Sequence, residues 1–109
     1  MDIATEIFNQ LGGKMFAAMT GSKIIEIDTD SITFKLIRNK SKANELKIVL
    51  NGADLYDISF VKHSYPKLNK TTWKYTNEKV EIIREYKDMF CDQLQAIFTE
   101  TTGLYTRIY

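Results

Sequence analysis

Two stretches of the chain carry basic side chains that could bind anions, and one of them also carries aromatic rings that could stack. One is a polar loop between two alternating segments, and the other is interleaved with aromatic residues. The candidate binding residues are Arg38, Lys40, Lys42, Lys70, Trp73 and Tyr75. Lys35 and Lys47 flank the first stretch, and Tyr65, Lys67 and Lys74 belong to the second. Cations hold phosphates and rings stack on bases, so this combination suits single-stranded nucleic acid. The competing interpretation is ordinary solvated loops, in which lysines also oppose edge aggregation.

The overall charge does not single out nucleic acid. Lys and Arg total 15, Asp and Glu total 14, and the net charge is +1. A balanced chain gives no strong field toward nucleic acid or a membrane. The sequence contains no apolar run long enough for a transmembrane helix, so no membrane association is expected.

The residues that could carry catalysis or hold a metal lack partners. His63 is the only histidine, and no cysteine or histidine lies at ligand spacing from it. We therefore expect a surface-loop histidine and no metal site. Cys91 begins a predicted helix, where the dipole can lower a thiol pKa, but no Cys–His signature flanks it. A small, partly buried helix residue is the favoured interpretation of Cys91.

Two glycine-containing segments could be taken for phosphate cradles. Gly12-Gly13-Lys14 lacks P-loop spacing, and its glycines are predicted to end a helix and lead into a strand. Thr20-Gly21-Ser22-Lys23 could offer backbone N–H groups to a phosphate, but a hairpin turn is favoured.

Paired carboxylates give no catalytic site either. Asp54 and Asp57 would point to opposite faces of a strand. Glu81 and Glu85 would share a face, which we interpret as the solvated one. We therefore expect no catalytic residues, no cofactor, no enzyme activity and no small-molecule ligand.

The elements that must position these residues follow from periodicity. A helix is predicted over 2–11, capped by Asp2 and stopped by the glycines that follow. An apolar run at 14–19 comes next, and alternation predicts strands near 23–28, 32–36, 46–50 and 56–60. A loop is expected over 63–70 and a short strand at 73–75.

The segment after residue 77 fits two patterns. One long helix over 78–101 is possible, but a strand at 79–86 followed by a helix at 89–102 is favoured. The apolar face of that last helix comprises Phe90, Leu94, Ile97 and Phe98. Gly103 would stop the helix, Leu104 would pack back on it, and 105–109 could add a short strand.

These elements predict one α+β domain spanning 1–109. We expect an N-terminal helix, an antiparallel sheet of about five or six strands and a C-terminal helix packed on one face. The length suits a single core, and the apolar content of 44% indicates a packed fold.

Motifs at the two ends of the chain carry a resemblance. QLGGKMF at 10–16 and MTGSK at 19–23 open it, and CDQLQ at 91–95, IFTE at 97–100 and TGLY at 102–105 close it. Together they resemble a family of small proteins from phages, prophages and plasmids, in which the segment before the last helix looks like a strand. This sequence differs by a longer, more basic middle around Lys62 to Lys79. The family has no assigned activity, so it supplies no site residues.

The resemblance implies a small accessory protein of a mobile element. Together with the lack of a catalytic constellation, it makes a non-enzymatic protein that occludes a protein partner the first expectation. An inhibitor of a host defence system, anti-CRISPR-like or anti-restriction-like, is one form of it. Nucleic-acid binding through the basic and aromatic loops is the alternative. The single cysteine and the absence of a signal sequence predict the cytoplasm of a bacterial host. Exposed sheet edges leave self-association into a homo-oligomer open.

Overall fold

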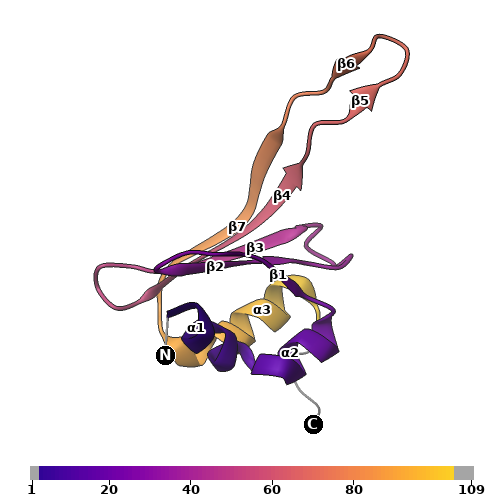
Figure 1. The fold of residues 1–109 in the computed structure, drawn as a ribbon. Helices are drawn as coiled ribbons and strands as arrows, with labels where there is room; N and C mark the ends of the chain where they lie inside the picture. The colour runs from indigo at the N-terminus through magenta and orange to yellow at the C-terminus, as the bar shows by residue number, and fades with distance from the viewer. Residues whose placement is uncertain (1–2, 105–109) are drawn as a thin grey trace.

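Helices cover one face of an antiparallel sheet (Figure 1). A computed structural model describes residues 3–104. Its helices are α1 (Ile3–Leu11), α2 (Gly13–Thr20) and α3 (Leu94–Thr102), with a short 3-10 helix η1 (Cys91–Gln93) before α3. The predicted α+β class is confirmed. The cap expected at Asp2 and the strand expected at 105–109 lie outside the described residues.

The sheet is a five-stranded antiparallel one with the order β1-β2-β3-β4-β7. Its strands are β1 (Lys23–Ile27), β2 (Ser31–Lys35), β3 (Glu45–Leu50), β4 (Tyr56–Ser64) and β7 (Lys79–Met89). Two further strands, β5 (Leu68–Asn69) and β6 (Lys74–Tyr75), form a separate ribbon. The predicted antiparallel sheet is therefore confirmed, and β4 extends further than expected.

Alternation along the central strands builds the core. The inward residues, each at most 1% exposed, are Ile32, Phe34, Leu46, Ile48, Ile58 and Phe60. From the helices, the Phe16 ring packs edge-on against Phe34 and Phe98, at centroid distances of 5.4 and 5.0 Å. Burial of these large apolar side chains is the main stabilising term, and it fixes which face of the sheet the helices cover.

The segment after the first helix is a second helix, which corrects the expectation that the glycines lead into a strand. Gly12 and Gly13 have φ of 120° and 60°, so the chain turns there and starts a new helix at once. Phe16 and Thr20, one helical turn apart, are both fully buried. The Thr20–Lys23 segment is the left-handed end of α2 at Gly21 and not a hairpin turn.

The strand predicted at 79–86 is confirmed, and two bulges explain why its sequence also fitted a helix. The residues of β7 that pack against the core are Ile83, Tyr86 and Met89, three positions apart. The register against β4 shifts between Tyr56 and Ile58 and again between Phe60 and Val61. Each shift adds a residue to β7. Residues of β7 that face the core are therefore three positions apart, where a regular strand would have them two apart.

The bulge near Ile83 also corrects the expected pairing of acidic residues. Glu81 lies opposite Lys62 and Glu85 lies opposite Ser59. Since Lys62 and Ser59 are three apart on a regular stretch of β4, they point to opposite faces, and so do their partners. Glu81 and Glu85 therefore do not share a face.

The last helix is confirmed but starts later than predicted. Leu94, Ile97 and Phe98 are buried as expected, whereas Phe90 is 60% exposed. Phe90 has an extended backbone before η1, so it lies outside the helical face. Gly103 ends α3 in the left-handed conformation, and Leu104 packs against the core as predicted.

Candidate functional site

A two-stranded arm projects from the sheet (Figure 1). Strand β3 pairs with β4 only as far as Val61, and beyond it β4 pairs with β7 alone, ending with Ser64 opposite Lys79. The β5–β6 ribbon continues in the same direction. We call residues 62–81 the arm and the rest of the described chain the body. The segment 63–70, predicted as a loop, is therefore mostly the first of the two segments of this arm, and it includes the end of β4 and all of β5.

The end of the arm is a hydrogen-bonded turn. The carbonyl of Asn69 accepts the N–H of Trp73 at 2.7 Å. The side-chain oxygen of Asn69 accepts the N–H groups of Thr71 and Thr72. Trp73 itself adopts a positive φ of 57°. The short strand predicted at 73–75 is observed as Lys74–Tyr75, and the tip is ordered by its backbone and not by burial.

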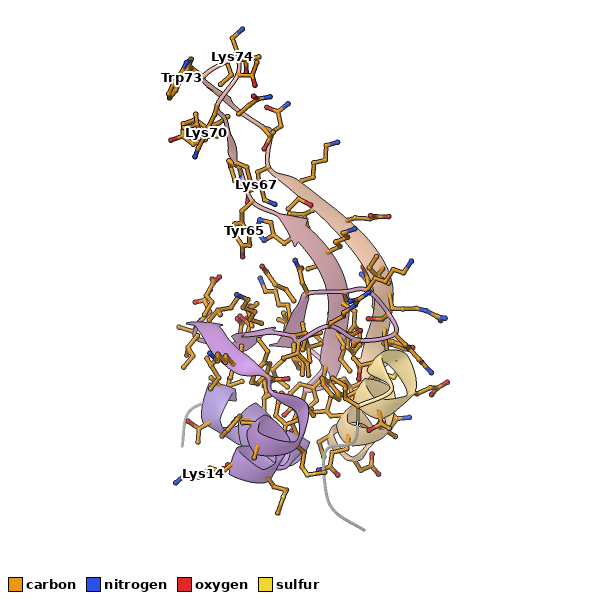
Figure 2. All side chains as sticks on the ribbon, turned by 90° about the vertical axis from the view of Figure 1, so that its right-hand side faces the viewer. Lys14, Tyr65, Lys67, Lys70, Trp73 and Lys74 are labelled. Carbon is orange, nitrogen blue, oxygen red and sulfur yellow. The ribbon has the colours of Figure 1, made fainter. Side chains whose placement is uncertain are left out.

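The tip carries the second group of predicted binding residues (Figure 2). Trp73 is 74% exposed, Tyr75 is 70% exposed and Tyr65 is 53% exposed. Lys67, Lys70 and Lys74 lie among these rings, and residues 64–77 contain no Asp or Glu. At the projecting end the structure thus brings Lys70 and Lys74 together with the exposed rings of Trp73 and Tyr75. Tyr65 lies lower on the arm, where one face of its ring stacks on His63.

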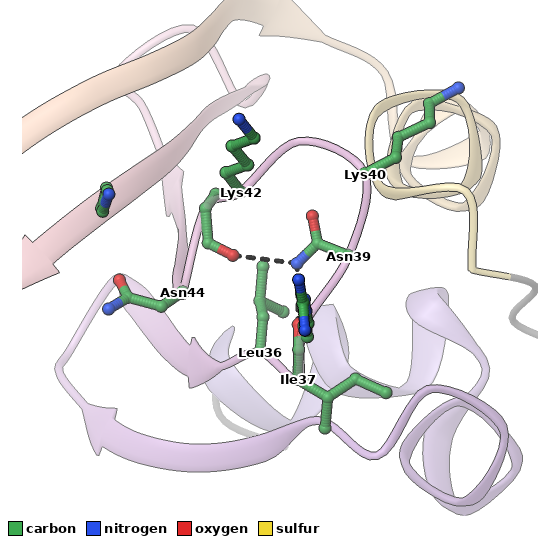
Figure 3. A pocket seen from close by; sticks show the side chains of 9 residues that line it. Leu36, Ile37, Asn39, Lys40, Lys42 and Asn44 are labelled. Atoms are coloured by element: carbon green, nitrogen blue, oxygen red, sulfur yellow. Dashed lines mark hydrogen bonds between the residues drawn. The ribbon is translucent and has the colours of Figure 1, made fainter.

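The first group of predicted residues lies at the foot of the arm. Arg38, Lys40 and Lys42 line a pocket of about 420 Å³ together with Lys62 of β4, and no acidic side chain lines it (Figure 3). The side-chain amide of Asn39 donates to the carbonyls of Ile37 and Ala43, both at 2.8 Å. The loop is therefore shaped by its own hydrogen bonds. The Lys40 side chain is directed away from the pocket, toward α3.

A second hollow connects this pocket with the arm. It is lined by Lys62, Ser64, Lys79, Val80 and Glu81, so Lys62 borders both hollows. The predicted flanking lysines are placed differently. Lys35 and Lys47 alternate with the inward residues Phe34, Leu46 and Ile48, so they lie on the sheet face away from the helices.

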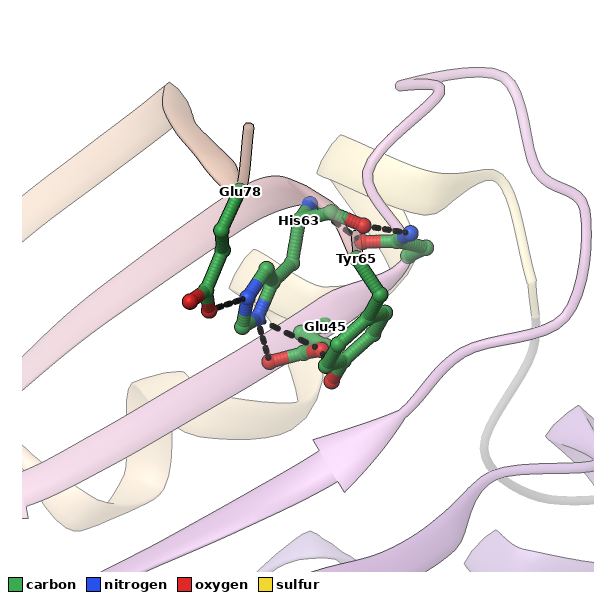
Figure 4. A network of polar contacts seen from close by, with 5 residues as sticks. Glu45, His63, Tyr65 and Glu78 are labelled. Carbon is green, nitrogen blue, oxygen red and sulfur yellow. Dashed lines mark hydrogen bonds and ion pairs between the residues drawn. The ribbon is translucent and has the colours of Figure 1, made fainter. Parts of the chain in front are cut away.

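A polar network at the root of the arm was not predicted from the sequence (Figure 4). His63 lies on β4 with its ring between Glu45 and Glu78, and its Nδ1 is 3.1 Å from Glu45 Oε2. Tyr65 stacks on the His63 ring at a centroid distance of 4.0 Å and donates its hydroxyl to Glu45. His63 is therefore a half-buried strand residue, which corrects the expected surface-loop histidine.

The network also sets proton affinities. The hydrogen bond to Glu78 raises the pKa of His63 above its ordinary value, and Glu45 acts in the same direction. The hydrogen bond to Glu45 raises the pKa of Tyr65 to about 12. Tyr65 therefore keeps its hydroxyl proton and donates it to Glu45, which holds the ring against His63.

The side chain of Asn44 extends the pairing between β3 and β4 at the root of the arm. The amide group of Asn44 donates to the carbonyl of His63 at 2.8 Å, and its oxygen accepts the His63 N–H at 2.7 Å. Asn44 thus takes the position of a strand residue just before β3 begins. Together with the Glu45–His63–Glu78 contacts, it fixes the arm to the body.

The remaining candidate residues stay apart. Cys91 is exposed at the start of a three-residue 3-10 helix, which corrects its expected partial burial. Asp54 lies in the turn before β4, and Asp57 accepts hydrogen bonds from Asn51 and the Asp88 N–H. Within residues 3–104, no group of side chains could hold a metal ion, and no helix is long and apolar enough to cross a membrane.

Comparisons with protein-family models, with curated proteins and with solved structures give no match. The geometry therefore defines only a class: an α+β domain with a projecting, basic and aromatic arm. Further function has to be argued from these residues.

Proposed function

We propose that this protein binds single-stranded nucleic acid without catalysing a reaction on it. The carrying observation is the tip of the arm, where the exposed rings of Trp73 and Tyr75 lie with Lys70 and Lys74 and where residues 64–77 contain no acid. From the sequence, nucleic-acid binding was the alternative to occlusion of a protein partner. The geometry favours nucleic-acid binding because cations and exposed rings lie together at one accessible end of the arm.

The exposed rings argue for a binding role because they contribute little to the body. Trp73 and Tyr75 leave most of their surface in water, where an aromatic side chain is costly unless it meets a partner. Stacking of a base on such a ring contributes about 1–3 kcal/mol per base, and it tolerates any sequence. The neighbouring Lys70 and Lys74 can neutralise phosphates of the same strand.

The pocket at the foot of the arm supplies a second set of cations. Arg38 and Lys42 line the same hollow as Lys62, and Lys40 borders it with its side chain directed toward α3. Lys62 also borders the hollow lined by Lys79 and Glu81, where two cations and one carboxylate connect the pocket with the arm. A strand of nucleic acid could follow this path with its phosphates on the lysines and its bases against the tip.

Fluorescence anisotropy with a labelled single-stranded oligonucleotide tests the proposal. Binding is measured at several salt concentrations for the wild type, Trp73→Ala and the double variant Lys70→Ala/Lys74→Ala. Trp73→Ala is expected to weaken binding by about 1–3 kcal/mol. Loss of two phosphate contacts should reduce the slope of log K against log salt by roughly 1.4 for a single strand.

Lys14→Ala is the matched control because Lys14 lies on α2, far from the arm (Figure 2). It removes one positive charge and should leave affinity and salt slope nearly unchanged. A wild type that does not bind at low salt, or whose affinity is independent of salt, would refute the proposal. Equal losses for Lys14→Ala and the arm variants would show nonspecific attraction only.

The occluding protein suggested by the phage resemblance is a second candidate, favoured by one observation. Trp and Tyr are enriched at protein interfaces, and here they stand on a projecting hairpin. In this proposal, the arm inserts into a protein partner such as a component of a host defence system. The network at the arm's root would then hold the arm ready for docking.

A pull-down from bacterial lysate, with and without nuclease, separates the two candidates. One enriched protein that survives nuclease and is lost with Trp73→Ala supports occlusion. Enrichment that disappears with nuclease supports nucleic-acid binding. Turnover of a substrate that ends on a single polar substitution would contradict both.

A further inference from the structure

The strand at one edge of the sheet is unusually apolar. In the described part of the chain, β1 pairs with β2 on one side and with no strand on the other. All five of its residues are exposed, including Ile24 at 42%, Ile25 at 46% and Ile27 at 60%. Exposed edge strands are usually kept polar because their free N–H and C=O groups invite pairing.

The register of β1 gives its side chains two distinct faces. Lys23 lies opposite Lys35 and Glu26 lies opposite Thr33, both on the sheet face away from the helices. The register shift between Ile24 and Glu26 makes this possible, because without it residues three apart would alternate. Ile24 and Ile27 lie opposite Phe34 and Ile32, on the face that the helices cover.

The charges along β1 would match those of a second, antiparallel copy of β1. Lys23 and Glu26 are equally distant from a point between Ile24 and Ile25. A two-fold axis through that point, perpendicular to the sheet, would place each Lys23 opposite Glu26 of the other copy. The contact would therefore contain two opposite-charge pairs on one face, a favourable arrangement on paired antiparallel strands.

We propose that two copies of this chain pair through β1, antiparallel and in this register. The pairing joins the two sheets into one of twice the width, with all helices on the same face. Ile24 and Ile25 of both copies meet at its centre.

Exposed apolar groups nearby extend the contact on the helix side. Met15 and Met19 of α2 are 47% and 37% exposed, and α2 leads directly into β1. Ile37, 47% exposed, lies against Gly21 at the junction between them. These side chains would be partly covered by the second copy.

The dimer would carry two arms. Each arm extends from the ends of β4 and β7, the two strands farthest from β1 in the sheet. The two arms would therefore lie at the two ends of the joined sheet. Two arms on one particle raise the avidity for any long or repeated partner. The pairing itself does not depend on what the arms bind.

Sedimentation velocity over a wide range of concentrations tests the pairing. The wild type is expected to show a reversible monomer–dimer equilibrium. Lys23→Glu should weaken dimerisation by roughly tenfold, since it places like charges opposite each other. The double variant Lys23→Glu/Glu26→Lys restores opposite charges and should restore dimerisation. Ile25→Lys should give a monomer, and circular dichroism of each variant should match the wild type because these residues are exposed.

Val80→Lys is the matched control, since Val80 is 59% exposed at the other edge of the sheet. It should leave dimerisation unchanged. A wild type that is monomeric at every concentration would overturn the proposal. So would an unaffected Lys23→Glu variant, a failed charge-swap rescue, or a dimer that only Val80→Lys disrupts.

Discussion

The body and the arm of this protein are ordered by different interactions. In the body, the rings of Phe16, Phe34 and Phe98 are fully buried and in edge-on contact. In the arm, Trp73 and Tyr75 are mostly exposed, and order comes from backbone pairing and from the polar contacts of His63. Burial therefore holds the body, while the arm is free to present its side chains to a partner.

The largest expected effect is in the body. Phe98→Ala removes a buried ring from contact with Phe16 and Phe60, and it should lower the free energy of unfolding by about 3–5 kcal/mol. Urea unfolding followed by far-UV circular dichroism measures it. Tyr75→Ala at the tip is the control, with an expected change within about 0.5 kcal/mol. Equal costs for the two variants would mean that the arm belongs to the folding core.

A smaller effect is expected where α2 meets β1. Thr20, fully buried, donates its hydroxyl to the Phe16 carbonyl at 2.7 Å and contacts the Ser22 hydroxyl at 2.8 Å. Thr20→Val keeps the shape but removes the hydroxyl that contacts the Ser22 side chain and accepts the Ser22 N–H, so unfolding should become easier by about 1–3 kcal/mol. Thr72→Val, exposed in the arm, should be neutral in the same urea titration. No difference between the two would show that these hydrogen bonds do not stabilise the junction.

The root of the arm should respond to pH. Glu78 first, and Glu45 with it, raise the pKa of His63 in the folded protein. The stability that protonated His63 contributes is therefore fully present below its unfolded pKa of about 6.5, and is lost as pH rises through the raised folded value. Unfolding free energies of the wild type and His63→Gln, compared between about pH 5 and 9, should converge toward the alkaline end. Parallel curves would mean that His63 does not tie the arm to the body through its charge.

The smallest effect is expected for the fluorescence of Trp73, the only tryptophan in the chain. Because Trp73 is 74% exposed, its emission should shift little when urea unfolds the body. Circular dichroism should report a full transition in the same samples. A large red shift coinciding with that transition would place Trp73 against the body. If the small shift is observed, Trp73 can serve as a local probe of binding at the tip.

The candidate site was only partly predictable. Residue type alone identified Arg38, Lys40, Lys42, Lys70, Trp73 and Tyr75 as binding candidates. It could not show that they divide into a pocket and a tip, because that depends on how far β4 outruns β3. The His63 network was missed because its carboxylates lie 18 and 15 residues away in sequence.

Local sequence determined the strands and the last helix, since alternation and helical spacing report directly which face of an element is buried. It did not determine α2, because after Lys14 the run at 15–19 has no polar residue to reveal its period. It left β7 open between helix and strand, because two bulges change a spacing of two into a spacing of three. Bulges, strand lengths and sheet edges depend on pairing with segments distant in sequence. Only the tertiary structure therefore decided the position of the arm and which of its side chains are exposed.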